Sequence, residues 1–268
     1  MCNEFCEGWP FADACRLAAD TGYEGIEVAP FTISNSVEEV NAGQRAALRE
    51  TAKRAGLEVV GLHWLLVKPT GLHINHPDPA VRQRTASYLS AEIDFCADLG
   101  GTRMVVGSPS QRVVLESDSQ EAAWARTVEV FKALAPQAAA RGVCLCIEPL
   151  TRKETNFITT AQEARRLVEA VQHPAFQMML DVRAMCGDVE PIPDIIRKSA
   201  PYLKHFHAND ANLGGPGSGD TDFAPIAAGL REAGYNGFVS VEVFDFSPGP
   251  EKIARESIRY LTEVFSDS

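Results

Sequence analysis

Short β-patterned runs alternate with longer segments of helical period along the whole chain. The alternation repeats about eight times, which is typical of βαβ units that build a parallel sheet. Within the helical segments, apolar residues recur on one face, as Leu89, Ile93 and Cys96 do. A chain of 268 residues is long for one open domain but ordinary for a closed α/β barrel. We therefore expect a single domain over residues 1–268, a TIM (β/α)8 barrel whose first strand is Cys2–Phe5.

Four of the predicted strands end in a residue that can bind a metal ion. These residues are Glu148, Asp181, His207 and Glu242. Alternate side chains of a strand face opposite sides of the sheet, so Cys146 shares a face with Glu148 while Ile147 faces the helices. The same parity directs all four terminal side chains inward. Barrel enzymes hold their active sites at the carboxyl ends of the strands, so we expect the four to meet in one mouth.

Three carboxylates and one imidazole form an oxygen-rich donor set, which favours Mn²⁺, Mg²⁺ or Co²⁺ over a closed zinc site. Such a cation polarises a sugar carbonyl and stabilises an enediolate when the adjacent C–H proton is removed. Glu148 and Glu242, on opposite flanks of the substrate, are candidates for the bases. For any single strand-end carboxylate, a helix cap or a salt bridge is the alternative role.

Further polar side chains follow or end the predicted strands. Candidates for binding substrate are Glu27, His63, Asn209 and Asp210. His205 lies one inward step below His207 and is a candidate for supporting it. Trp64 is placed to stack on a sugar face, with core packing as its alternative role. The glycine-rich loop at residues 214–219 lacks the lysine of a phosphate-binding P-loop, so we expect it to form an active-site flap.

Composition excludes several classes of protein. A formal net charge of −11 leaves no broad positive surface for nucleic acid. No run approaches the roughly 18 apolar residues of a membrane span. The seven cysteines are odd in number and lack a CxxC pair, which suits reduced thiols. We expect a cytoplasmic protein whose partner is a small-molecule sugar, with neither nucleic acid nor membrane as a partner.

The order of the four strand-end residues, in the contexts IEP, LD, HxHxxD and SVE, resembles the xylose-isomerase-like barrel superfamily. The likeness covers almost the whole chain and is greatest for the ketose 3-epimerase and sugar-phosphate isomerase/epimerase branch. It implies that Glu148, Asp181, His207 and Glu242 bind a divalent metal ion. It also implies that Glu148 and Glu242 exchange a proton through a cis-enediolate, and that Glu154 binds substrate. We expect a homo-oligomer, a dimer or a tetramer, or a hetero-oligomer if the chain is a lyase subunit.

Two positions depart from the ketose 3-epimerase pattern. That branch carries a substrate-gripping His and Arg where this chain has Ala184 and Leu213. Dehydration or cleavage of a keto-sugar therefore stays open, including the role of a C-glycoside-cleaving subunit, as does a non-catalytic sugar-binding barrel. The abasic-site endonucleases of the superfamily are disfavoured, because Ala184 also replaces one of their extra histidines and the chain is acidic.

Overall fold

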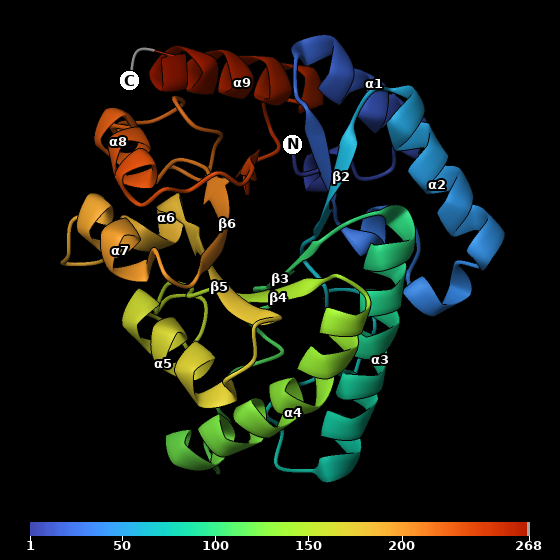
Figure 1. Ribbon diagram of the computed structural model, residues 1–268, viewed down its shortest axis with the longest axis vertical. Coiled ribbons are helices and arrows are strands. Elements are labelled where there is room, and N and C mark those ends of the chain that lie inside the picture. The colour runs from blue at the N-terminus through green and yellow to red at the C-terminus, as the bar shows by residue number, and fades with distance from the viewer. Residues whose placement is uncertain (267–268) are drawn as a thin grey trace.

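The computed structural model describes residues 1–266, which form one parallel sheet surrounded by helices (Figure 1). The strands are neighbours in chain order and are β1 (Gly25–Val28), β2 (Glu58–Leu62), β3 (Arg103–Val106), β4 (Cys144–Ile147), β5 (Phe176–Asp181), β6 (Leu203–Ala208) and β7 (Val239–Val241). The α-helices are α1 (Phe11–Thr21), α2 (Ala42–Arg54), α3 (Pro79–Leu99), α4 (Gln120–Ala140), α5 (Ala161–Val171), α6 (Val182–Met185), α7 (Ile192–Ser199), α8 (Ala224–Glu232) and α9 (Pro250–Ser266). Short 3₁₀ helices cover Glu4–Cys6, Pro30–Thr32 and Val37–Glu39. This ring of helices around parallel strands confirms the predicted single-domain TIM barrel.

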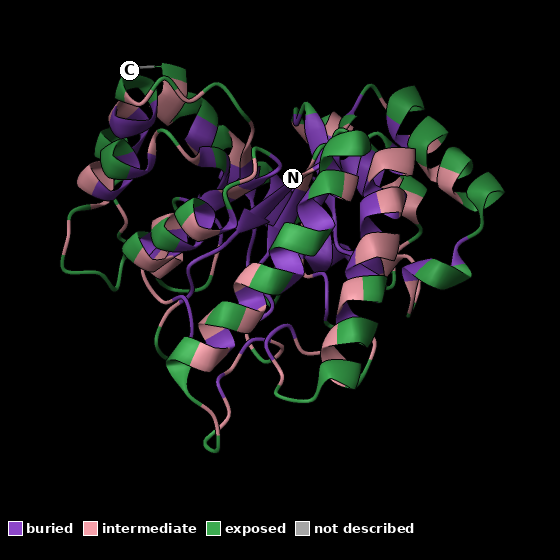
Figure 2. Ribbon diagram, turned by 60° about the horizontal axis from the view of Figure 1, so that its bottom comes forward, coloured by how far each residue is buried: buried purple, intermediate pink, exposed green. Residues whose placement is uncertain are grey.

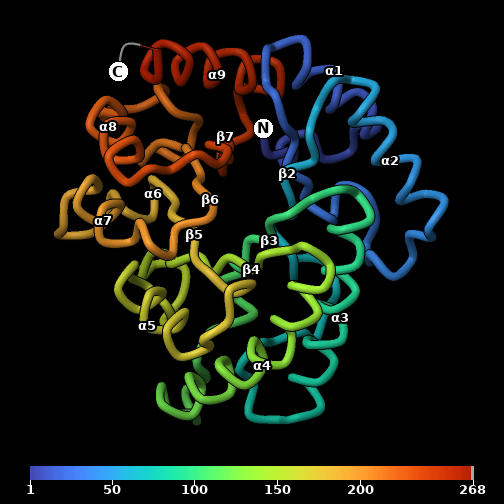
Figure 3. Tube along the Cα trace, viewed as in Figure 1, coloured from blue at the N-terminus to red at the C-terminus, as the bar shows by residue number. Residues whose placement is uncertain are grey.

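The ring closes through the start of the chain rather than through a full eighth strand. The N–H of Cys2 donates to the carbonyl of Val241 at 2.9 Å, and Cys2 also bridges to Glu27 of β1. Figure 3 shows β7 beside the N-terminus. The predicted strand Cys2–Phe5 is therefore wrong in length: it shrinks to a bridge at Cys2, because the chain turns into the 3₁₀ helix Glu4–Cys6.

Capping residues determine where the helices begin and end. The carboxylate of Asp78 accepts the N–H of Ala80 at 2.8 Å, and Pro79 occupies the first position of α3. The same helix ends at Gly100, whose φ of 92° is left-handed. α3 can therefore stop and turn directly into β3. None of the helices within residues 1–266 combines the length and the apolar character that crossing a bilayer requires.

Side chains alternate between the inside and the outside of the barrel as predicted. Met178 of β5 and Ile147 of β4 belong to the large apolar core between sheet and helices. Met179 and Cys146, one position away, form a separate small cluster with Val105. Figure 2 shows buried strands and helices with one buried and one exposed face. The predicted parity is thus confirmed for β4 and β5, and it directs the residues that end these strands inward.

Candidate active site

Four side chains converge at the carboxyl end of the barrel. Each of Glu148, Asp181, His207 and Glu242 offers one ligand atom, and these four atoms lie within 4.8 Å of one another. Glu148 directly follows β4, Asp181 ends β5, His207 lies near the end of β6, and Glu242 follows β7. All four are at most 5% exposed. The structure therefore brings together the four residues that the sequence proposes as metal ligands, and we call them the carboxylate–histidine centre.

Like charges crowd this centre. Burial, and then the charges of Glu242 and Asp181, raise the pKa of Glu148 well above its ordinary value. Burial and the charge of Glu242 raise the pKa of Asp181 to about 6. Burial also acts to raise the pKa of Glu242, but the charge and the hydrogen bond of His207 outweigh it and lower that pKa. A divalent cation would relieve this repulsion, so the donor set fits the hard cation predicted from sequence.

Two of the carboxylates are positioned by close neighbours. Asp181 accepts the N–H of Ala184 at 2.8 Å through Oδ1, which caps α6, and accepts from Nδ2 of Asn209 at 2.5 Å through Oδ2. Asp181 is therefore a helix cap and a member of the centre at once. Asn209, which the sequence proposes as a substrate contact, is fully buried and gives its side-chain N–H to Asp181. A Cβ atom at Gly107 would stand 1.8 Å from Oε2 of Glu148, so any larger residue there would have to displace that carboxylate.

Trp64 holds Glu242 from the side. Its indole Nε1–H donates to Oε1 of Glu242 at 2.7 Å, and its ring stacks on Phe244 with 6.1 Å between centroids. The backbone of Trp64 lies in the left-handed region at φ 53°, a conformation that surrounding contacts must stabilise in a residue with a bulky side chain. The sequence predicts that Trp64 stacks on a sugar or packs in the core. No pattern in the sequence indicates its hydrogen bond to Glu242.

His207 lies between two carboxylates. Its Nδ1 is 3.0 Å from Oε2 of Glu242, and its Nε2 is 3.1 Å from Oε1 of Glu27. The other Glu27 oxygen lies 2.7 Å from Nε2 of His205. Glu27, which the sequence proposes for binding a sugar hydroxyl, is fully buried and contacts both histidines. It lies below the centre and orients the ring of His207, and His205 supports that ring through Glu27.

Two other predicted substrate contacts point elsewhere. Nε2 of His63 lies 2.9 Å from Oε2 of Glu4 inside the barrel, and the His63 ring is fully buried beneath the pocket. The Asp210 carboxylate accepts the backbone N–H groups of Gly219 and Thr221 at 2.9 and 3.3 Å. Asp210 therefore shapes its own loop, and neither residue reaches the cavity in which the chemistry would take place.

A cavity of about 360 Å³ opens onto the centre. It is lined by Trp64, Val67, Gly107, Ser108, Pro109, Ser110, Gln111, Glu148, Leu150, Glu154, Glu242 and Phe244. Glu148 and Glu242 are the two members of the centre in this wall, while Asp181 and His207 lie deeper. Apolar walls with a few convergent polar groups are typical of small-molecule sites of this size. Glu154, which the family resemblance implies as a substrate-binding residue, also lines this cavity.

The glycine-rich loop does not cover this cavity. A Cβ atom at Gly217 would stand 2.5 Å from the Tyr260 ring, and one at Gly215 would stand 2.1 Å from Oγ of Ser257. Both partners belong to α9. The predicted flap is therefore wrong, because these glycines allow the loop to pack closely on a helix.

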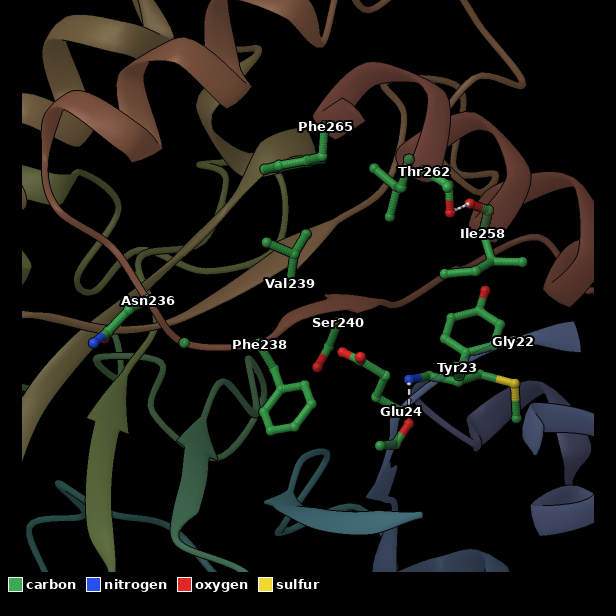
Figure 4. Close-up of a pocket in the computed structure, with 14 residues that line it drawn as sticks. Gly22, Tyr23, Glu24, Asn236, Phe238, Val239, Ser240, Ile258, Thr262 and Phe265 are labelled. Atoms are coloured by element: carbon green, nitrogen blue, oxygen red, sulfur yellow. Dashed lines mark hydrogen bonds between the residues drawn. The ribbon is translucent and has the colours of Figure 1, made fainter. Parts of the chain in front are cut away.

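A second cavity, of about 520 Å³, lies at the opposite end of the barrel (Figure 4). Tyr23, Phe238 and Ser240 lie near the starts of β1 and β7, and Ile258 and Thr262 of α9 face them. None of the site residues predicted from sequence lines it. TIM barrels carry their chemistry at the carboxyl ends of the strands, so we assign the candidate site to the first cavity.

The comparisons with known protein families, sequences and structures agree with one another. The model of the xylose isomerase-like TIM barrel family matches residues 15–264. A D-psicose 3-epimerase of Ruminiclostridium cellulolyticum is 38% identical over 121 residues, which are 45% of this chain and only 41% of that relative. The D-psicose 3-epimerase of Agrobacterium fabrum is 29% identical over 237 residues, covering 87% of this chain and 79% of the relative. The crystal structure of a D-psicose 3-epimerase in the presence of D-fructose has a TM-score of 0.85 and 25% identity, covering 96% of this chain and 94% of that one.

Proposed function

This chain belongs to the xylose isomerase-like TIM barrel family, and on that premise we propose that it is a sugar isomerase/epimerase that moves a proton within a keto-sugar. The observation that carries the proposal is the placement of Glu148 and Glu242. They reach one cavity from β4 and β7, which β5 and β6 separate in the ring. A binding module needs no pair of acid/base groups on two sides of its ligand, whereas inversion of a carbon does.

A divalent metal ion belongs to this proposal. Glu148, Asp181, His207 and Glu242 would hold it, and their hard donor set suits Mn²⁺, Mg²⁺ or Co²⁺. When bound, such an ion polarises the sugar carbonyl and offsets the negative charge that develops on its oxygen.

The two glutamates carry the proton. One carboxylate removes the proton from the carbon beside the carbonyl, which leaves an enediolate. The other returns a proton to the opposite face of that carbon and inverts it. Trp64 keeps Glu242 in place during this exchange, and Gly107 gives Glu148 the room to approach the substrate. Glu154, in the same wall, supplies a contact for a sugar hydroxyl.

Elimination is the second candidate outcome. If the substrate carries a leaving group β to the abstracted proton, the same carbanion expels it instead of being reprotonated. Ala184 and Leu213 favour keeping this possibility, because neither side chain can form the hydrogen bonds of the clamp found in the epimerase pattern. In either case we propose a cytoplasmic enzyme that acts on a small-molecule sugar as a homo-oligomer, a dimer or a tetramer, with a second kind of subunit if it is a lyase.

Solvent deuterium exchange tests the proposal. Wild-type protein is incubated in D₂O with a panel of keto-sugars, with Mn²⁺ or with a chelator, and deuterium incorporation and product configuration are read by NMR. We expect metal-dependent incorporation at the carbon next to the carbonyl, and its loss in both Glu148→Gln and Glu242→Gln. Release of water or of a substituent would identify the lyase. Exchange that persists with the chelator, or in Glu148→Gln, would refute the mechanism.

A further inference from the structure

We infer that Arg183 is a specificity-determining residue that, with Glu154 and Phe244, forms a subsite for a neutral sugar hydroxyl in the cavity wall. This inference rests on the proposed function and deepens it. The subsite supplies the substrate grip that Ala184 and Leu213 do not. Arg183 is not one of the residues that the family resemblance implies for the site.

Arg183 contacts both partners directly. Its Nη2 donates to Oε1 of Glu154, and its guanidinium carbon lies 4.2 Å from the centroid of the Phe244 ring. The side chains of Arg183 and Glu154 are 12% and 23% exposed, so the ion pair is largely shielded from solvent. Glu154 and Phe244 line the cavity, and Arg183 contacts both without being one of its lining residues. Arg183 therefore acts as a positioning residue that fixes two side chains of the pocket wall.

The hydrogen bonds of Glu154 define what the subsite accepts. Its Oε2 accepts both the N–H and the hydroxyl of Thr151, at 3.1 and 2.7 Å, and its Oε1 accepts from Arg183. A carboxylate offers about four acceptor positions, so one on Oε1 is left. A sugar hydroxyl can donate to that position. An anionic group is disfavoured there, because the charge of Arg183 is already paired with Glu154.

The subsite is coupled to the carboxylate–histidine centre. The backbone N–H of Arg183 donates to Oδ1 of Asn209 at 2.8 Å, and the amide of Asn209 donates to Asp181. On the other side, Phe244 stacks on Trp64, which in turn holds Glu242. A hydroxyl bound at Glu154 is thus held at a fixed distance from the acid/base groups, which is the requirement for orienting a substrate.

Ala184 and Leu213 stand at the two positions where the epimerase pattern has a substrate-binding His and Arg, and neither side chain can form a hydrogen bond with a sugar. Leu213 is 42% exposed, and its backbone carbonyl is occupied by the N–H groups of Phe244 and Asp245 at 2.8 and 2.9 Å. Ala184 has only a methyl group and gives its N–H to Asp181. Arg183 has a buried Nε with no hydrogen-bond partner among the described residues. Its guanidinium contacts two residues of the cavity wall, Glu154 and Phe244.

The test compares three variants. Arg183→Met removes the ion pair, Arg183→Lys keeps a positive charge, and Arg166→Met is a control, because the Arg166 guanidinium lies 5.3 Å from the ring of Trp124 on α4, outside the cavity. Binding of a ketose and of its monodeoxy analogues is measured by calorimetry, and turnover by deuterium exchange. In the wild type, one deoxy analogue should bind or react at least about 100-fold worse than the parent ketose.

We expect Arg183→Met to raise KM about tenfold or more with a smaller change in kcat, and to abolish discrimination against that one analogue. Arg183→Lys should restore part of the discrimination, and Arg166→Met should behave as the wild type. An Arg183→Met enzyme that still discriminates would overturn the inference. A sugar phosphate that binds more tightly than the neutral ketose, in an Arg183-dependent way, would overturn the neutral ligand class.

The calorimetric binding measurement distinguishes a failure of this inference from a failure of the proposed function. Arg183-dependent ketose binding without deuterium exchange would refute the proposed reaction and support the subsite. Exchange in Arg183→Met with the wild-type KM and the wild-type discrimination against the deoxy analogue would refute the subsite and support the reaction. A wild-type protein that binds no ketose would refute both.

Discussion

The Nε2 atom of His207 lies 3.1 Å from Oε1 of the fully buried Glu27. This contact gives the two ring nitrogens different surroundings: Nε2 faces Glu27, while Nδ1 faces Glu242 of the carboxylate–histidine centre at 3.0 Å. His205 bonds to the other Glu27 oxygen at 2.7 Å and so prevents the carboxylate from rotating. The orientation of a predicted metal ligand is therefore determined by a residue from the opposite side of the barrel interior.

Replacing Glu27 should weaken metal binding more than folding. In Glu27→Gln the amide can accept from only one of the two histidines through its oxygen, so the His207 ring loses its fixed orientation. We expect Mn²⁺ to bind about 10–100-fold more weakly, measured by isothermal titration calorimetry. Glu58→Gln, at an exposed position in β2, is the matched control. Equal affinities of the two variants would show that Glu27 has no part in orienting His207.

Enlarging Gly107 should displace Glu148. A Cβ atom there would stand 1.8 Å from Oε2 of Glu148, so Gly107→Ala must shift that carboxylate from its present position. We expect the deuterium-exchange rate to fall about 100-fold or more, as small misplacements of reacting groups do. Gly187→Ala is the control, since its Cβ would meet nothing closer than the Ala184 carbonyl at 4.0 Å. A Gly107→Ala enzyme with wild-type activity would show that the exchange does not depend on the position that Gly107 leaves for Glu148.

Trp64→Phe should lower turnover while keeping the sugar-stacking surface. The change removes the indole donor that lies 2.7 Å from Oε1 of Glu242 but retains an aromatic ring beside Phe244. A hydrogen bond to a charged group stabilises by about 1.5–3 kcal/mol, so kcat should fall about 10- to 100-fold with a smaller change in ketose affinity. Trp124→Phe, on α4 away from the cavity, is the matched control. Similar kcat values for the two variants would count against the role of Trp64.

The barrel fold can be predicted from the sequence because the patterns that mark its strands and helices lie within short segments of the chain. Apolar periodicity marks each strand and helix, and strand parity alone directs Glu148 and Asp181 inward. The structure of the first residues is harder to predict, since Cys2 contributes only a bridge between β7 and β1. Whether a short run becomes a strand there depends on how the ring closes, and that is a property of the whole sheet rather than of residues 2–5.

The hydrogen-bond partners of the site residues are harder to predict from the sequence, because they depend on contacts across the barrel. Glu27 and His205 are 178 positions apart in sequence but share a hydrogen bond. A glutamate with inward parity near a strand end predicts a polar group in the mouth, yet β1 continues to Val28 and the Glu27 carboxylate contacts His205 and His207. The pairing of Arg183 with Glu154 likewise joins α6, which follows β5, to the loop that follows β4, and no spacing in the sequence signals it.

Glu92 should make the protein less stable as the pH rises. Both of its carboxylate oxygens are buried on α3 without a hydrogen-bond partner among the described residues, and burial raises its pKa well above the ordinary value. At low pH both the folded and the unfolded state hold the proton. Above pH about 4.5 the unfolded state loses it while the folded state keeps it, so the free energy of unfolding falls by about 1.4 kcal/mol per pH unit until the folded pKa is reached.

Glu92→Gln isolates this effect because its amide does not titrate. The difference in the free energy of unfolding between Glu92→Gln and the wild type should increase in favour of the variant from pH 5 to pH 8, measured by urea denaturation at each pH. The other buried carboxylates contribute equally to both proteins and cancel in the difference. Glu50→Gln, an exposed position on α2, should show no such trend. Parallel pH profiles for Glu92→Gln and the wild type would mean that Glu92 titrates in the folded protein as it does in the unfolded chain.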